Sequence, residues 1–219
     1  MKTINLSILL LLNIFSTSIT IPQSAKISSP FVSVNVGGFI TTHEDFSKVY
    51  DSNLGFVFGG GAGLPLEKNW CLYGKVTYFS KTGVPVIYSY NYQNWHIVST
   101  NERKEGTATF KQWIINGGFQ YNEFLSEDFT LGINGGITFA IISEQERNSS
   151  GSVLSSTDGT SAFGFFIGLA LERNFQDSPI SAFIEAQYNY AIHDILSGNY
   201  GGVNLSLGLR YYFKDRKIS

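Results

Sequence analysis

The sequence contains little cysteine and little charge, and each shortage excludes a class of protein. Cys71 is the only cysteine, so the chain has neither a disulfide framework nor a cysteine-based metal site. Charged residues make up 15% of the chain and the formal net charge is −2, which gives no reason to expect a nucleic-acid partner. No run of eighteen apolar residues follows the N-terminal region, which excludes a helical membrane protein.

Glycine and aromatic residues are abundant instead. The 219 residues include 23 glycines, and aromatic residues reach 15%. This composition is typical neither of a disordered chain nor of a helical enzyme. The length predicts one domain, or at most two.

The N-terminus has the form of a secretory signal. Lys2 precedes an apolar run over residues 4–15, and small polar residues follow over residues 16–20. We therefore expect a signal peptide at residues 1–25, cleaved somewhere after residue 18, and a single mature domain at residues 26–219. No cysteine follows the apolar run, so a lipoprotein anchor is not expected.

The last part of the chain, residues 202–213, is a long amphipathic strand. Successive strand residues point to opposite faces, and one face here is entirely apolar. That face carries Val203, Leu205, Leu207, Leu209, Tyr211 and Phe213. A tilted strand of this length spans the ~25 Å apolar band of an outer membrane.

The same alternation recurs along the chain and predicts about eight strands. We expect them near residues 30–40, 54–66, 70–80, 108–121, 129–142, 160–172, 180–190 and 202–213. Long connections are expected at residues 41–53, 81–107, 143–159 and 191–200, and short turns at 67–69, 122–128 and 173–178. Residues 84–92, within the longest connection, are read as extra strand above the membrane. Alternating long and short connections indicate an all-β, antiparallel, up-and-down barrel.

In this pattern the chain resembles the small eight-stranded outer-membrane β-barrels of the OmpA/OmpX type, over about residues 30–213. In that family the last strand, ending in phenylalanine, is recognised by the barrel-assembly machinery; Leu205, Leu207, Leu209, Tyr211 and Phe213 match it, although a polar tail at residues 214–219 follows. The resemblance implies a monomeric barrel in the bacterial outer membrane, with both mature termini in the periplasm. It implies contact with outer-membrane lipid and lipopolysaccharide, an unknown surface ligand and no cofactor.

The polarity of the two faces favours a membrane barrel over a soluble one. A soluble barrel buries its bulky apolar face, and five large residues of one strand, between Phe163 and Leu171, would already overfill so small a lumen. The other face carries glycine and small polar residues. Two aromatic girdles are expected: Trp70, Phe129, Tyr211 and Phe213 at one end, and Tyr78, Trp113, Tyr188 and Tyr190 at the other.

Three features suggest chemistry, and each has a plainer interpretation. The glycines of residues 59–63 resemble a phosphate cradle but lack the Lys-Ser/Thr of a P-loop, and glycine in a barrel strand more often relieves crowding. The three histidines fall in expected outer loops, where His43 with Glu44 and Asp45 suggests a metal site, and His193 with Asp194 and Ser197 a nucleophile set. Isolated loop histidines are usually solvated, so we expect no catalytic, cofactor-binding or metal-binding residues.

Lys75, Glu185 and Arg210 are charges on the face assigned to the lumen. Unpaired charge there is costly, so we expect Glu185 to lie within reach of at least one of the two cations. The cluster is interpreted as a structural plug, with a gate or selectivity element as the alternative. The function expected from the sequence is a non-enzymatic barrel with a structural, surface-interaction or adhesion role. A narrow channel for small solutes and an outer-membrane lipid-modifying enzyme are the alternatives.

Overall fold

The computed structural model describes residues 29–43, 46–67, 69–93, 96–103, 105–175, 178–193 and 198–213, with the backbone alone at 87–93, 96–103 and 193. The expected signal peptide and the polar tail at residues 214–219 lie outside these residues. None of the helices in the described part of the chain is long and apolar enough to span a membrane.

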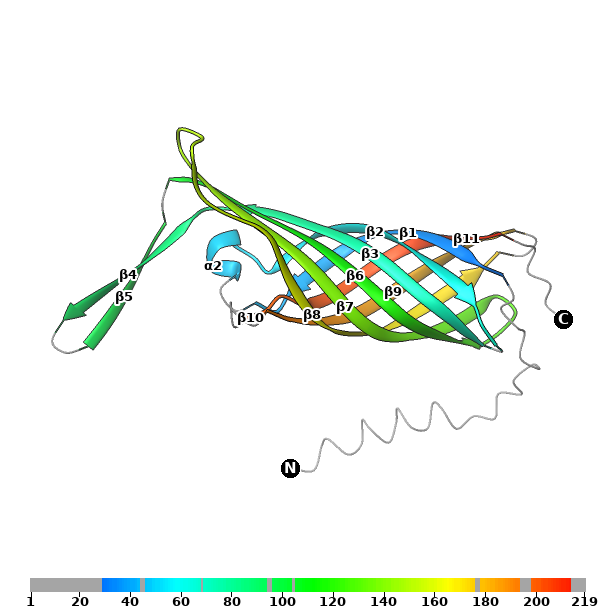
Figure 1. The fold of residues 1–219 in the computed structure, drawn as a ribbon. Helices are drawn as coiled ribbons and strands as arrows, with labels where there is room; N and C mark the ends of the chain where they lie inside the picture. The colour runs from blue at the N-terminus through cyan, green and yellow to red at the C-terminus, as the bar shows by residue number, and fades with distance from the viewer. Residues whose placement is uncertain are drawn as a thin grey trace, which may run out of the picture.

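The described chain is almost entirely strand. Its elements are β1 (Phe31–Thr41), α2 (Phe46–Tyr50), β2 (Leu54–Pro65), β3 (Trp70–Gly83), β4 (Val86–Gln93), β5 (His96–Arg103), β6 (Gly106–Phe124), β7 (Phe129–Asn148), β8 (Val153–Asn174), β9 (Ile180–His193), β10 (Gly198–Asn199) and β11 (Gly202–Tyr212). Eight of the strands pair antiparallel in the order β1-β2-β3-β6-β7-β8-β9-β11, and β11 pairs with β1 to close a barrel (Figure 1). The predicted fold class is confirmed.

The two ends of the barrel differ. Short turns join β2 to β3, β6 to β7 and β8 to β9 at one end, which we call the short-turn end. The described termini also lie there, since the amide of Phe213 donates to the carbonyl of Pro30 at 3.1 Å. The other end, which we call the long-connection end, carries α2, β10 and the β4–β5 hairpin (Figure 1).

Glycines allow so narrow a barrel to curve. Gly118 and Gly136 face each other on β6 and β7. A Cβ at Gly118 would lie 2.1 Å from the carbonyl oxygen of Gly135, and one at Gly136 would lie 2.2 Å from that of Gly117. Any side chain here would force the strands apart, so these glycines serve curvature, as sequence reasoning expected of the barrel glycines.

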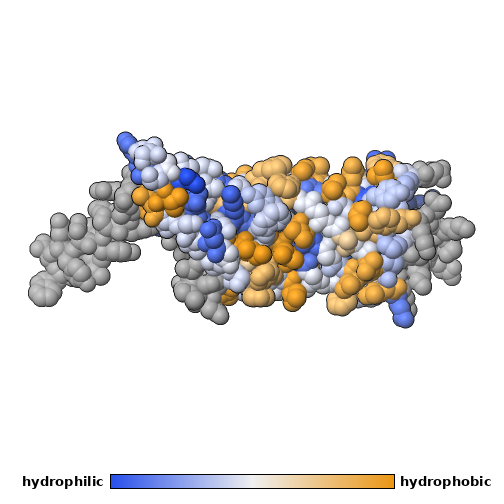
Figure 2. Space-filling view, turned by 45° about the horizontal axis from the view of Figure 1, so that its top comes forward, coloured by the Kyte–Doolittle hydropathy of each residue, from blue (hydrophilic) through white to orange (hydrophobic). Residues whose placement is uncertain are grey.

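The assignment of the two faces is also confirmed. Val34, Phe163 and Ile137 are 65%, 66% and 74% exposed, although all three are large and apolar. Figure 2 shows such residues spread over the barrel wall in orange. An apolar wall of this extent is typical of a surface that faces lipid. Aromatic pairs mark both rims: Tyr78 and Trp113 lie 4.7 Å apart toward the long-connection end, and Trp70 and Tyr121 lie 5.2 Å apart at the short-turn end.

The predicted loop at residues 143–159 is wrong. β7 continues to Asn148 and β8 begins at Val153, so the connection between them is a short turn. The alternation of apolar residues stops near residue 142 because the strands leave the apolar band, and strands in water need no apolar face. Other strands are also longer than expected: β6 runs to Phe124, β8 to Asn174 and β9 to His193.

Two further connections contain structure. The strand expected at residues 84–92 is confirmed as β4, which pairs with β5. Residues 41–53 were expected to form a polar loop, but they include α2, whose Phe46 and Tyr50 are buried.

Candidate functional site

Lys75 and Glu185 form an ion pair across the inside of the barrel. They come from β3 and β9, which are not neighbours in the sheet, and both side chains are almost fully buried. Two more lumen residues donate to the Glu185 carboxylate: the Tyr73 hydroxyl at 3.1 Å and the Asn134 side-chain amide at 3.0 Å. A buried carboxylate surrounded by three donors is well compensated for the loss of water.

Arg210 forms a second ion pair, nearer the short-turn end. Its guanidinium lies 2.6 Å from a carboxylate oxygen of Glu172 on β8. The hydroxyls of Ser181 and Tyr212 also donate to Glu172. The guanidinium lies over the ring of Phe31, 4.5 Å from its centroid, and is therefore packed as well as paired.

Sequence reasoning placed Lys75, Glu185 and Arg210 together and missed Glu172. The structure puts all three in the lumen, with Glu185 against Lys75 and Arg210 against Glu172. The alternation of β8 was sufficient to find Glu172, because it shares the inward face with Ala170. It was overlooked because it lies next to an expected turn.

Neutral side chains fill the middle of the lumen. The Asn116 amide donates to Asn189 at 2.9 Å, and the Thr138 hydroxyl donates to Asn116 at 2.7 Å. A neighbouring set of buried polar residues has side-chain atoms with no partner in the structure: Asn35, Thr77, Gln187, Asn204 and Ser206. One part of the lumen wall is therefore polar without being internally satisfied.

An aromatic cluster closes the long-connection end. Phe46 of α2 stacks on Tyr50 and meets Phe110 edge-on at 5.1 Å, and Phe79 completes the cluster. The Tyr50 hydroxyl donates to the Glu144 carboxylate. Burial, and next this hydrogen bond, raise the pKa of Tyr50, so the hydroxyl keeps its proton at neutral pH. This bond ties α2 to β7.

Side chains thus extend into the lumen at both ends and in the middle. A second buried cluster, of Phe31, Cys71, Tyr73, Phe124, Phe166 and Tyr212, lies toward the short-turn end. Ion pairs, amides and the α2 cluster follow toward the other end. Side chains commonly fill the interior of a barrel with this number of strands.

Comparisons with solved structures agree with this architecture. Neisserial surface protein A matches with a TM-score of 0.55 and 15% identity, covering 84% of this chain and 97% of that one. The fold is that of a small outer-membrane β-barrel. Ail, the attachment invasion locus protein of Yersinia pestis, matches at TM-score 0.49 and 12% identity, covering 84% of this chain and 99% of that one. No protein-family model and no curated protein matches the chain.

The outer-membrane protease OmpT of Escherichia coli is also similar, at TM-score 0.44 and 11% identity, over 84% of this chain and 97% of that one. One fold can carry unrelated activities, so the role must be argued from the residues of this chain.

The last strand of the barrel, β11, presents the residues that matched the assembly signal. Leu205, Leu207, Leu209, Tyr211 and Phe213 are all exposed on the outer wall. The rings of Tyr211 and Phe213 lie 5.6 Å apart. Recognition of this strand by the assembly machinery stays a prediction.

The histidines do not form a site among the described residues. His43 is half-buried with its ring 5.0 Å from that of Tyr200, and His96 and His193 belong to strands rather than loops. Glu44, Asp45, Asp194 and Ser197 lie outside the described residues. Within the described part of the chain no group of three potential metal ligands exists.

Proposed function

We propose that this chain is a non-enzymatic outer-membrane barrel, sealed to solutes, that presents a strand extension above the membrane for interaction at the cell surface. In this proposal the short-turn end faces the periplasm and the long-connection end faces outward. Short periplasmic turns and longer outer loops are the usual arrangement of such barrels.

The lengths of the strands carry the proposal. β1, β2, β3, β9 and β11 have 11 to 14 residues, whereas β6, β7 and β8 have 19, 20 and 22. β8 pairs with β9 only from Phe163 onward, so its residues 153–162 extend past the end of β9 by roughly 33 Å along the strand, at ~3.3 Å per residue. Figure 1 shows the β7–β8 hairpin rising beyond the barrel at this end.

The extension is polar and adds nothing to the barrel. Residues 153–159 of β8 are all exposed, and most of them are serine, threonine, aspartate or glycine. Membrane insertion does not require the extension, because it begins where the apolar wall ends. Binding residues commonly lie on such projections held by a rigid scaffold.

Shortening the hairpin tests this role. Replacing residues 145–156 by a two-residue turn should leave the barrel folded, since the change removes no lumen or wall residue. We expect attachment of expressing cells to cultured animal cells to fall at least tenfold, while the level of folded protein in the outer membrane stays the same. Unchanged attachment would contradict the interaction role.

Cysteine labelling provides the orientation control. Cys71 is buried, so we expect a maleimide to react only with an introduced cysteine. Two single variants, Ser150→Cys at the hairpin tip and Ser126→Cys at a short turn, then report the accessibility of the two ends separately. A membrane-impermeant maleimide should label Ser150→Cys on intact cells and leave Ser126→Cys unlabelled until the outer membrane is opened. The reverse pattern would overturn the orientation.

The channel alternative has one observation in its favour, the polar wall around Gln187 and Asn204. The ion pairs and the α2 cluster lie on either side of it, so we expect the folded protein in planar bilayers to show no steady conductance. A steady conductance would favour the channel instead, provided that the protein in the preparation is folded, as shown by different migration on boiled and unboiled gels.

A further inference from the structure

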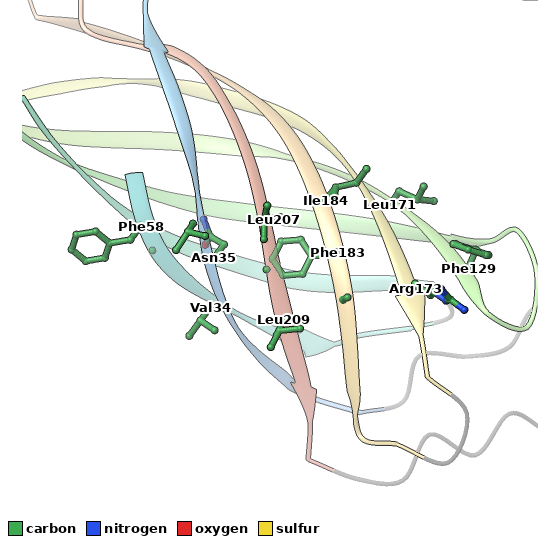
Figure 3. Close-up of a pocket in the computed structure, with 14 residues that line it drawn as sticks. Val34, Asn35, Phe58, Phe129, Leu171, Arg173, Phe183, Ile184, Leu207 and Leu209 are labelled. Atoms are coloured by element: carbon green, nitrogen blue, oxygen red, sulfur yellow. The ribbon is translucent and has the colours of Figure 1, made fainter. Parts of the chain in front are cut away.

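An open groove crosses the outer wall of the barrel from β8 to β2. Its cavity volume is about 720 Å³. Large apolar side chains, among them Leu171, Leu209 and Phe58, form its sides (Figure 3). The groove exists because a small outward residue, Ala182, lies between the longer side chains of Arg173 on β8 and Leu209 on β11.

A second hollow joins the first. It has a cavity volume of about 420 Å³ and shares Leu171, Ile184 and Leu207 with the groove. Ala186 lines it, between the outward residues Leu169 of β8 and Leu205 of β11. The alternation Ala182-Ile184-Ala186 on β9 therefore makes two apolar branches separated by Ile184.

Arg173 lies at one end of the groove, at the short-turn rim. It is exposed, it is the second-last residue of β8, and its strand neighbours are Phe129 on β7 and Ala182 on β9. Its guanidinium lies 5.9 Å from the centroid of the Phe175 ring. Figure 3 shows Arg173 beside Phe129 at the end of the row of apolar side chains.

The charges around Arg173 leave its guanidinium available. Among the described residues it forms no ion pair. Asp128 is on the adjacent turn, where its carbonyl accepts from the amide of Asn174, but its carboxylate is not paired with Arg173. Glu172, next in sequence, points into the lumen and binds Arg210.

We propose that the groove binds one diacyl phospholipid of the inner leaflet, with net negative charge, whose phosphate is held by Arg173 and whose two acyl chains lie in the two branches. Arginine recognises phosphate through paired N–H donors, and its charge favours an anionic headgroup over a zwitterionic one. The proposal rests on the membrane insertion and orientation proposed above.

The dimensions fit this occupant. Four strand spacings of ~4.8 Å, roughly 19 Å in all, separate Arg173 on β8 from Phe58 on β2. Half of the ~30 Å hydrocarbon core is about 15 Å, so a chain that starts at the rim and follows this oblique path stays within one leaflet or slightly beyond it. Two branches beside one cation match a headgroup with two chains.

Native mass spectrometry of the folded barrel tests the site. The full chain is reconstituted in vesicles of equal parts phosphatidylglycerol and phosphatidylcholine, then extracted into mild detergent. We expect the wild type to retain one phosphatidylglycerol, and Arg173→Gln to retain about tenfold less, the scale of one lost charge-assisted hydrogen bond. Ala182→Leu/Ala186→Leu fills both branches, keeps Arg173 and should lose retention as well.

Two control variants change the same kinds of residue elsewhere. Lys111→Gln removes an exposed cation of β6 at the other end of the barrel, and Gly117→Leu adds a leucine to the wall of β6, where a Cβ meets no atom within 4 Å. Both should retain lipid as the wild type does. Equal retention of the two lipids, or wild-type retention by Arg173→Gln or by the double leucine variant, would overturn the site.

Failure of this proposal is distinguishable from failure of the proposed insertion. Migration of each variant on an unboiled gel shows whether the barrel has folded. Its recovery with membranes shows whether the barrel has inserted. A barrel that passes both checks but holds no phosphatidylglycerol defeats the lipid site alone. A barrel that is recovered as a soluble protein defeats both.

Discussion

Replacing Glu185 with glutamine should lower the free energy of unfolding by about 3–5 kcal/mol. The substitution keeps the shape of the side chain but leaves the buried ammonium of Lys75 without its counter-charge. The cost arises from that unpaired charge more than from the lost pair itself. Urea unfolding of the barrel refolded in detergent micelles gives the free energy from the midpoint and the slope.

The double variant separates the two contributions. Glu185→Gln with Lys75→Met removes both charges, and we expect it to be less destabilised than Glu185→Gln alone. Gln187→Met is the matched control on the same strand: neither polar atom of Gln187 has a partner in the structure, so its loss should change stability by less than about 1 kcal/mol. A single variant no less stable than the double variant would show that the ion pair does not hold the lumen together.

Replacing Ile167 with arginine should cost about 2–4 kcal/mol in a lipid bilayer. Ile167 is 57% exposed on the outer wall and lies midway along the part of β8 that belongs to the barrel. A charge at this depth has neither water nor a counter-ion within reach. Unfolding by urea from phospholipid vesicles measures the effect.

The same substitution near a rim is the control. Val32 is the second residue of β1, at the short-turn end, and Val32→Arg should cost only about 0–1 kcal/mol because the side chain reaches the interface. Ser206→Ala, on the lumen face of β11, should also be mild since its hydroxyl has no partner. Equal losses for Ile167→Arg and Val32→Arg would mean that the wall does not face lipid.

The faces of the strands were predictable, and so was an ion pair of Glu185 with one of two cations, but the ends of the strands and the choice between Lys75 and Arg210 were not. A period of two assigns each residue of β3, β9 or β11 to one face without knowledge of its neighbours, which is why Lys75, Glu185 and Arg210 are predicted to lie inside. The pairing of Lys75 with Glu185 depends on how β3 and β9 are staggered relative to each other. These strands face each other across the closed barrel and are not paired, so no local sequence pattern reveals their relative position.

The ends of the strands were predicted wrongly for a different reason. β7 and β8 continue as polar strands above the apolar wall, where serine and threonine are equally compatible with a turn. α2 is too short for helical periodicity, and its function as a cap comes from two aromatic residues, Phe46 and Tyr50, that only the closed barrel brings against Phe110. Tertiary packing decides such segments.

The unequal lengths of the barrel strands leave one side of the extension open. β8 pairs with β9 only from Phe163 onward, so the backbone of residues 153–162 faces no strand of the described part of the chain on that side. Free edges of this kind attract other chains, and proteins blunt them with irregular pairing and charge. The register shift between Ile142 and Glu144, with Gly159 at φ 73° and Asp158 beside it, interrupts the edge in this way. In the orientation proposed above, we therefore expect the hairpin to project from the membrane without pairing with a second copy of itself.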